Sequence, residues 1–403
     1  MFPSLTIPFL PDGWNELKSY GFMLMVGFLT AIWLACKRAM RLKADPDVIL
    51  NMGLLSLIFG VIGARIMFVA HYWDAQFANQ PNPIWAALAI NRGGLEFWGG
   101  PLLAIPAVMI YLWRIGASTR WYLDIVAPSL MWGLAFGRIG CLLNGCCWGG
   151  VCLDPHDPAR REAGLPWAIR FPFASPAMTQ QFAFRQMSLP KELIWFSPSG
   201  EAFPLPRDYL SISSHELYGP RRDWQKAVEQ QQTLERIGAD AALIDKQKKL
   251  VADLKSRMDA HETKTSPLLN QLKTYGLERT DLVELASHHG SLPVHPTQIY
   301  GMINAFVLSW VLTLMLYRRR RHGIVFGWMI ALYCVLRFLL ECIRQDNPLD
   351  VASLTISQSV CVAMMGFAVV YLMVMHRLPE RSPLAQPVEL VDENEPESVL
   401  ERA

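Results

Sequence analysis

Seven apolar stretches of membrane-spanning length constrain the fold of this chain more than any other feature. A helix needs roughly 20 mostly apolar residues to cross a hydrocarbon core about 30 Å thick. The stretches that reach or approach this length run approximately over 20–36, 50–70, 95–113, 121–143, 298–317, 323–343 and 352–375. We therefore expect an all-α polytopic membrane protein with about seven transmembrane helices.

The charged residues are spread unevenly along the 403-residue chain. The chain has 37 Lys and Arg and 35 Asp and Glu, and residues 151–294 hold 18 of each class. This balance lacks the net basic footprint of a nucleic-acid-binding protein, so we expect no nucleic-acid partner. The pattern predicts transmembrane helices 1–4 in 1–150, an extracytoplasmic loop and helical arm in 151–294, helices 5–7 in 295–376, and a disordered cytoplasmic tail in 377–403.

The basic residues of the short loops predict an orientation, because such loops are retained on the cytoplasmic side. They follow the first, third and fifth predicted spans: Lys37, Arg38, Arg41 and Lys43; Arg114 and Arg120; and Arg318, Arg319, Arg320 and Arg321. The N-terminus is then expected outside and the C-terminus inside, with the large insertion between helices 4 and 5 outside. No cleavable signal sequence is evident near the start of the chain.

The insertion has two regions of different composition. Residues 151–220 are rich in Pro and aromatic residues, which is typical of irregular structure at a membrane surface. Within 222–260, the apolar residues Ile237, Ile244, Val251 and Met258 recur every seven positions, which predicts an amphipathic helix or a helical hairpin. The alternatives for this arm are a solvated helix without chemistry and a docking element for a partner.

Ionisable residues inside the predicted spans are costly and mark candidate functional sites. They are Arg65, Arg138, Arg337 and Glu341. Arg337 and Glu341 are four residues apart, so they lie on one helical face and can pair. The spans that carry these residues all run outward, and guanidinium groups bind phosphate oxygens bidentately. The pattern favours an anionic lipid headgroup as ligand, although the pair could also simply join two helices.

Glycine pairs precede and open the third predicted span. Gly93-Gly94 and Gly99-Gly100 flank the sequence Leu95-Glu96-Phe97-Trp98. Glycine allows the backbone to approach a ligand closely. Small residues also let membrane helices pack against one another, so both explanations stay open.

Several ordered motifs together resemble one known family. They are Tyr20-Gly21-Phe22, Gly63-Ala64-Arg65, Gly93-Gly94-Leu95, the stretch from Gly137-Arg138-Ile139-Gly140 to Asn144-Gly145 and Trp148-Gly149, Leu165 to Pro172, His295-Pro296-Thr297-Gln298-Ile299-Tyr300, and Arg337 to Arg344. This set resembles the bacterial prolipoprotein diacylglyceryl transferases. The resemblance covers nearly all of the membrane part and excludes roughly residues 183–290.

The resemblance implies a reaction at the outer leaflet of the bacterial inner membrane. The diacylglyceryl group of phosphatidylglycerol is moved to the lipobox cysteine of a prolipoprotein signal peptide, which forms a thioether and releases glycerol phosphate. The implied partners are therefore phosphatidylglycerol, prolipoprotein signal peptides with a lipobox cysteine, and membrane lipids. No cofactor and no metal are implied.

The resemblance also implies roles for individual residues. The catalytic candidates are Arg138, Arg337, Glu341 and Tyr20, of which the two arginines would bind the phosphate and Glu341 would orient Arg337. The substrate-binding candidates are Arg65, Gly93, Gly94, Gly99, Gly100, Asn144, Gly149, His295, Gln298 and Tyr300.

Three departures from the family pattern leave the general base open. Many relatives have an imidazole or a phenol where this chain has Trp98, which cannot take a proton. Cys141 and Cys146 stand where Asn and Glu are frequent, and Gly301 stands where Glu is frequent. Glu96 is one candidate to replace the missing base, and a catalytically altered family member is an alternative reading.

Four cysteines near the outer end of the fourth span support a competing hypothesis. Cys141, Cys146, Cys147 and Cys152 follow a C-x4-C-C-x4-C spacing. This spacing matches none of the usual paired zinc patterns, whereas a disulfide is favoured on the oxidising side of a membrane. A membrane thiol-disulfide oxidoreductase is therefore an alternative function. A transporter is disfavoured because the intramembrane charges gather toward one side.

Overall fold

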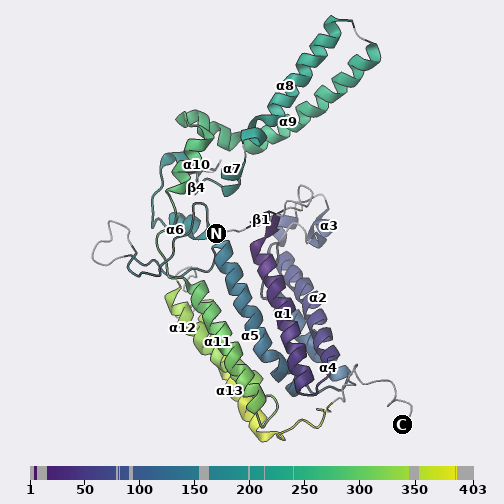
Figure 1. The fold of residues 1–403 in the computed structure, drawn as a ribbon, viewed down its shortest axis with the longest axis vertical. Coiled ribbons are helices and arrows are strands. Elements are labelled where there is room, and N and C mark those ends of the chain that lie inside the picture. The colour runs from purple at the N-terminus through teal and green to yellow at the C-terminus, as the bar shows by residue number, and fades with distance from the viewer. Residues whose placement is uncertain are drawn as a thin grey trace, which may run out of the picture. The chain divides into compact units, whose positions relative to one another are not determined.

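The computed structural model describes residues 4–6, 16–78, 80, 82–89, 94–153, 163–197, 200–212, 214–238, 240–344, 354–385 and 387. Its helices separate into two compact units. Phe2–Leu143 and Thr297–Ala403 form one, which we call the bundle, and Asn144–Pro296 forms the other, which we call the inserted unit. The inserted unit contains the charge-rich region of the sequence, and Figure 1 shows the chain course of both.

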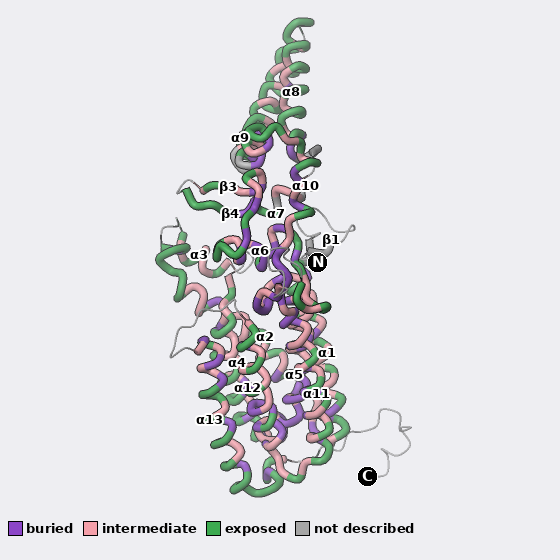
Figure 2. The backbone as a smooth tube through the Cα atoms, turned by 90° about the vertical axis from the view of Figure 1, so that its left-hand side faces the viewer, coloured by how far each residue is buried: buried purple, intermediate pink, exposed green. Residues whose placement is uncertain are grey.

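Six helices in the described part of the bundle are long and apolar enough to cross a membrane. They are α1 (Ser19–Arg41), α2 (Pro46–His71), α5 (Thr119–Asn144), α11 (Thr297–Arg318), α12 (Ile324–Ile343) and α13 (Ile356–Arg377). Many of their large apolar residues are exposed, as expected where lipid replaces water. Figure 2 shows exposed and partly buried backbone along these helices. This is the architecture of a multi-pass helical membrane protein.

The third predicted span differs from the expectation. It forms α4 (Gly99–Arg114), whose 16 residues fall short of the usual spanning length. Residues 94–98 precede it as coil and turn, since Gly94 has a left-handed backbone with φ of 78° and the helix begins only after Trp98. The bundle also includes α3 (Pro83–Leu88) and a short π-helix (Trp73–Phe77), and the strands β1 (Ser4–Thr6) and β2 (Glu16–Lys18) pair antiparallel.

Helices α2 and α4 pack through glycine. A Cβ atom added to Gly63 would overlap the carbonyl oxygen of Gly99, and one added to Gly99 would overlap that of Gly63. One turn away, a Cβ atom on Gly100 would lie 3.4 Å from the carbonyl oxygen of Gly60. The two backbones therefore touch at a small-residue crossing of the kind that holds membrane helices together.

A buried carboxylate fixes the turn between α11 and α12. Asp124 of α5 is fully buried and accepts hydrogen bonds from the backbone N–H groups of Gly323 (2.7 Å) and Phe326 (2.9 Å). Its Oδ2 atom also lies 3.1 Å from Nε of Arg319. Glycine is required at position 323, where φ is 95°. Asp124 thus joins the first half of the bundle to the second.

The described start of the predicted disordered tail is ordered. Glu380 accepts a hydrogen bond from the backbone N–H of His322 (2.9 Å) and pairs with Arg321 (3.1 Å). The backbone N–H of Ser382 donates to Nδ1 of His322 at 3.3 Å. The tail therefore continues past α13 as a segment bound through Glu380 and Ser382 to the loop between α11 and α12.

The inserted unit combines short elements with one long hairpin. Its elements are α6 (Pro176–Ala183), a 3-10 turn (Lys191–Leu193), β3 (Ile194–Phe196), β4 (Ala202–Pro204), α7 (Arg207–Ser211), α8 (Ser214–Arg236), α9 (Ala241–Tyr275) and α10 (Arg279–Ser287). Strands β3 and β4 pair antiparallel. The unit has its own apolar core, in which Leu268 and Leu272 of α9 pack with Leu193 and Leu205. The region predicted to be irregular therefore contains a small folded core.

Helices α8 and α9 form the predicted helical hairpin (Figure 1). Nε2 of Gln247 donates to the carbonyl oxygen of Ala227 at 3.1 Å, which fixes their register. The heptad positions behave unequally: Met258 is buried, whereas Ile237 lies in the turn and is 69% exposed because α8 ends one residue before it. Figure 2 shows α8 and α9 exposed along most of their length.

Removal of the outer part of this hairpin tests whether it contributes to stability. Deletion of 228–246, which joins the facing residues Ala227 and Gln247 through a short Gly-Ser linker, is expected to change the free energy of unfolding by less than about 1 kcal/mol. Leu268→Ala is the matched control and should cost about 2–5 kcal/mol, because Leu268 is fully buried. Thermal unfolding in detergent checks both. A deletion as damaging as Leu268→Ala would show that the outer hairpin belongs to the core.

Candidate active site

Two arginines surround one buried carboxylate at the end of α12. Nη2 of Arg337 lies 2.8 Å from Oε2 of Glu341, and Nη1 of Arg344 lies 3.6 Å from the same oxygen. The side chain of Glu341 is completely buried, and those of Arg337 and Arg344 are only 14% and 8% exposed. The predicted pairing of Arg337 with Glu341 is confirmed. Arg344, in contrast, was not among the predicted site residues.

The start of α13 supplies further hydrogen bonds to this group. The Thr355 hydroxyl donates to Oε1 of Glu341 (3.2 Å), and Nη2 of Arg337 donates to the Ser357 hydroxyl (3.2 Å). Thr355 also forms a capping box with Gln358 at the first turn of α13. Sequence reasoning missed these residues, although the Thr-x-x-Gln pattern before an apolar run is a helix-start signal that could have pointed to them.

Arg138 of α5 brings a third guanidinium to the same end of the bundle. Its positive charge acts on Arg337, as do the positive charge of Arg344 and the negative charge of Glu341. Gly301 of α11 makes the room: a Cβ atom there would lie 3.2 Å from Cδ and 3.3 Å from Nε of Arg138. Three guanidinium groups and one carboxylate leave a net positive charge, which suits a phosphate group.

Tyr20 lies next to the Gly-Arg-Ile-Gly motif. A Cβ atom on Gly140 would be 2.9 Å from Cδ2 and 3.4 Å from Cα of Tyr20, so the first turn of α1 rests directly on α5. The Tyr20 side chain is 39% exposed. Gly140 follows Arg138 by two residues in α5, so Tyr20 contacts α5 within one helical turn of Arg138.

Arg65 differs from its predicted role. Its Nε donates to the carbonyl oxygen of Ala87 (2.7 Å), Nη1 to that of Gly94 (2.9 Å), and Nη2 to those of Ala86 (2.9 Å) and Ala89 (3.2 Å). Three of these carbonyls belong to the C-terminal turn of α3, where helix carbonyls lack intrahelical partners. The guanidinium is thus used to hold α3 and the Gly94 loop against α2.

The glycine candidates divide in the same way. Gly99 and Gly100 lie in the crossing of α2 and α4, where Gly99 approaches the backbone of Gly63 and Gly100 approaches that of Gly60. Gly94 presents its carbonyl oxygen to Arg65. Gly93 lies outside the described residues.

The remaining candidates lie at the two junctions with the inserted unit. Asn144 is the last residue of α5, and Gln298 and Tyr300 lie in the first turn of α11. Within the inserted unit, the backbone N–H of Gly149 donates to the carbonyl oxygen of His295 (2.9 Å), and that of His295 donates to Gly150 (3.1 Å). The structure therefore joins two motifs, Trp148-Gly149 and His295-Pro296, that are far apart in the sequence.

Comparison with known proteins decides the family. The model of the family described as prolipoprotein diacylglyceryl transferase matches residues 11–207 and 212–374. The chain belongs to this family. The matched ranges run through the helical arm, where the motif resemblance had been expected to stop.

Curated relatives from several bacteria carry the name phosphatidylglycerol–prolipoprotein diacylglyceryl transferase. A Rhodopirellula baltica protein is 34% identical over 177 residues, which cover 41% of this chain and 32% of the relative. A Pseudoalteromonas translucida protein is 33% identical over 43% of this chain and 61% of the relative. An Aliivibrio fischeri protein is 30% identical over 54% of this chain and 74% of the relative. The chain thus spans less than two thirds of the first two transferases.

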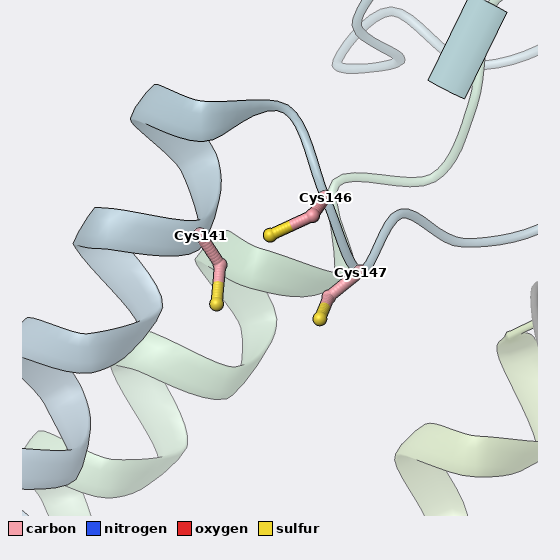
Figure 3. Close-up of side chains that lie close together, drawn as sticks. All are labelled: Cys141, Cys146 and Cys147. Atoms are coloured by element: carbon pink, nitrogen blue, oxygen red, sulfur yellow. The ribbon is translucent and has the colours of Figure 1, made fainter. Parts of the chain in front are cut away.

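The cysteines form a cluster in this member of the diacylglyceryl transferase family. The sulfur atoms of Cys141, Cys146 and Cys147 lie within 4.8 Å of one another (Figure 3), and Cys152 is not part of the group. Left-handed backbone at Gly145 (φ 77°) and Cys147 (φ 59°) turns the chain back toward α5. Thiolates are ligands for soft metal ions, so these three residues are the ones that could hold one.

The thiol-disulfide hypothesis gains no support. No disulfide is present among the eight cysteines, all of which are described. Neither the family nor the names of the relatives point to thiol-disulfide exchange. The absence of a resident metal remains a prediction.

Proposed function

We propose that this protein transfers the diacylglyceryl group of phosphatidylglycerol to the lipobox cysteine of prolipoproteins. The products would be a thioether-linked lipid and glycerol phosphate. The cluster of Arg337 and Arg344 around Glu341, with the charge of Arg138 acting on Arg337, carries the proposal, because the reaction needs a positive site for the phosphate that departs. The names of the curated relatives give the substrates.

The cluster suggests how leaving-group stabilisation is divided. Arg337 and Arg138 would bind the phosphate oxygens of the lipid headgroup. They would stabilise the negative charge that grows on the phosphate as the carbon–oxygen bond breaks. Glu341 fixes the position of Arg337 through the 2.8 Å ion pair, and Thr355 and Ser357 limit the rotation of both side chains. Because the Arg337 guanidinium is already fixed in position, it loses little conformational entropy when it binds the headgroup. The sequence calls for no cofactor in this reaction.

The remaining predicted residues extend this proposal. Tyr20 and Asn144 would hydrogen-bond the headgroup, and Gly149 would keep its loop close to it. His295, Gln298 and Tyr300 would bind or orient the signal peptide. The backbone pairing of Gly149 with His295 supports a common role for the two motifs, because a shift of one must move the other.

The proposed location is the bacterial inner membrane, with the active site toward the outer leaflet. Basic residues end α1 (Arg38 and Arg41), α4 (Arg114) and α11 (Arg318), all at the opposite end of the bundle from Arg337. Short loops rich in Lys and Arg are retained on the cytoplasmic side of the membrane. This supports an N-terminus outside and a C-terminus inside.

Purified protein in micelles tests the function directly. Supplied with phosphatidylglycerol and a lipobox peptide, it is expected to release glycerol phosphate and to add one diacylglyceryl mass to the peptide thiol. A peptide with Ser in place of the lipobox Cys is the control and should remain unmodified. Absence of both products above the level of a protein-free sample would refute the proposed activity.

A further inference from the structure

We propose that His71, held by Glu96, is the general base that removes the proton from the lipobox thiol. The assignment rests on the proposed transferase activity. The thiolate rather than the thiol is the reactive nucleophile, so the reaction needs a proton acceptor near the phosphate site.

The two side chains form a carboxylate–imidazole pair. Nδ1 of His71 lies 3.2 Å from Oε2 and 3.4 Å from Oε1 of Glu96. The His71 ring also stacks on Tyr72, with ring centroids 4.7 Å apart. A carboxylate at Nδ1 keeps the proton on that nitrogen, so Nε2 is the atom left to accept a proton, and the same carboxylate stabilises the imidazolium that forms. The His71 side chain is 63% exposed and the Glu96 side chain 25%, so a substrate can reach the ring.

The loop that carries Glu96 is pinned to α2, the helix that ends with His71. The backbone N–H of Glu96 donates to the carbonyl oxygen of Ala64 (3.0 Å), and Arg65 holds the carbonyl oxygen of Gly94 (2.9 Å). These bonds fix the loop on both sides of Leu95. By binding the carbonyl oxygen of Gly94, the Arg65 guanidinium therefore helps to hold the Glu96 carboxylate beside the His71 imidazole.

The position of His71 in the bundle agrees with this role. Helix α1 begins at the Arg138 end, where Tyr20 rests on Gly140, and α2 runs back to that end and finishes at His71. Near this end, the other charged groups on α2 and the following π-helix are Arg65, which binds carbonyl oxygens, and Asp74. The remaining charged residues of α1 and α2, namely Lys37, Arg38, Arg41 and Asp47, lie at the opposite end of these helices.

The other described histidines of the bundle lie at the opposite end. His376 is in the last turn of α13, and His322 follows the end of α11. Burial, followed by the charges of Arg319, Arg120 and Arg381, lowers the pKa of His322 to about 4. Trp98, which follows Glu96 by two residues, has no group that accepts a proton. His71 is therefore the imidazole that the described bundle offers at the phosphate end.

The chemical step balances with these groups. Nε2 of His71 takes the S–H proton, and the thiolate attacks the glyceryl carbon that is bonded to the phosphate oxygen. A sulfur–carbon bond forms, the carbon–oxygen bond breaks, and its electron pair leaves on the phosphate held by the arginines. The imidazolium then returns its proton to the released glycerol phosphate or to water.

The pH dependence of His71→Gln tests the assignment, because glutamine keeps a hydrogen bond to Glu96 but cannot accept a proton. At about pH 7 we expect kcat/KM to fall about 100-fold. Near pH 9 the loss should shrink to a few-fold, since a thiol with the ordinary cysteine pKa of about 8.5 ionises there without help. Glu96→Gln should lower kcat about tenfold with the same narrowing at high pH, and Glu96→Asp should restore most of it.

His376→Gln is the matched control and is expected to leave the rate and its pH dependence unchanged. Full activity of His71→Gln at all pH values would overturn the proposal. An equal loss at about pH 7 and pH 9 would also overturn it, because it would indicate a structural role. A loss of activity that narrows near pH 9 in His295→Gln but not in His71→Gln would assign the base to His295 instead. An inactive wild-type protein would refute the proposed function itself, which separates the two failures.

Discussion

Arg337→Ala is expected to reduce diacylglyceryl transfer at least about 10³-fold, with folding retained. The side chain supplies a guanidinium fork where the phosphate charge develops, and loss of one such donor costs about 10²–10³ in kcat even when the donor is neutral. The variant also leaves the buried Glu341 carboxylate with less positive charge beside it. Glycerol phosphate release by the purified variant, at saturating phosphatidylglycerol, gives the fold-change in kcat.

Two neighbouring substitutions calibrate this result. Arg337→Lys keeps the charge but loses the fork, so it should recover only part of the rate. Ser357→Ala removes one hydrogen bond of 3.2 Å from Arg337 and should cost less than about tenfold. Wild-type activity in Arg337→Ala would remove this arginine from the phosphate site.

Asp124→Ala is expected to lower the free energy of unfolding by about 3–5 kcal/mol, the largest stability effect in the bundle. The substitution leaves Arg319 as a buried charge without its carboxylate, and it leaves the backbone N–H groups of Gly323 and Phe326 without their acceptor. Thermal and denaturant-induced unfolding in detergent measure the loss.

The control is Asp245→Ala in the helical arm. Asp245 pairs with Lys249 at 2.8 Å, but both side chains are mostly exposed, so its loss should cost at most about 0.5 kcal/mol. A double variant, Asp124→Ala with Arg319→Met, should recover part of the stability because it removes both charges. Equal stability of Asp124→Ala and Asp245→Ala would contradict the role of Asp124.

The sequence predicted the membrane spans well because their signal is local. Six of the seven predicted segments became helices of full length, since length and apolar content suffice for that inference. The pairing of Arg337 with Glu341 was predictable for the same reason, because helical spacing alone brings them together. Helix α4 came out shorter because its start depends on the conformation of the Gly94 loop, which a hydropathy pattern does not describe.

The partners that lie far apart in sequence were not predictable. Nothing local in the sequence distinguishes Arg65, whose N–H groups bind carbonyls of α3, from Arg138, whose charge acts on Arg337. The same holds for Gly99, where close approach serves another helix. The sequence does not indicate a pairing of His71 with Glu96, because the two residues are 25 positions apart and only the fold brings their side chains together.

The long separation of partners in the bundle has a consequence for biosynthesis. Ser309 of α11 donates to the carbonyl oxygen of Pro128 in α5, 181 positions earlier, and Arg38 of α1 donates to Thr313, 275 positions later. The ribosome must finish the whole inserted unit before these partners exist. Until then, the spans α1, α2 and α5 are in the bilayer while Asp124 and Arg38 lack bonds that the finished bundle supplies. A nascent chain stalled before α11 is therefore expected to be a target for membrane proteases.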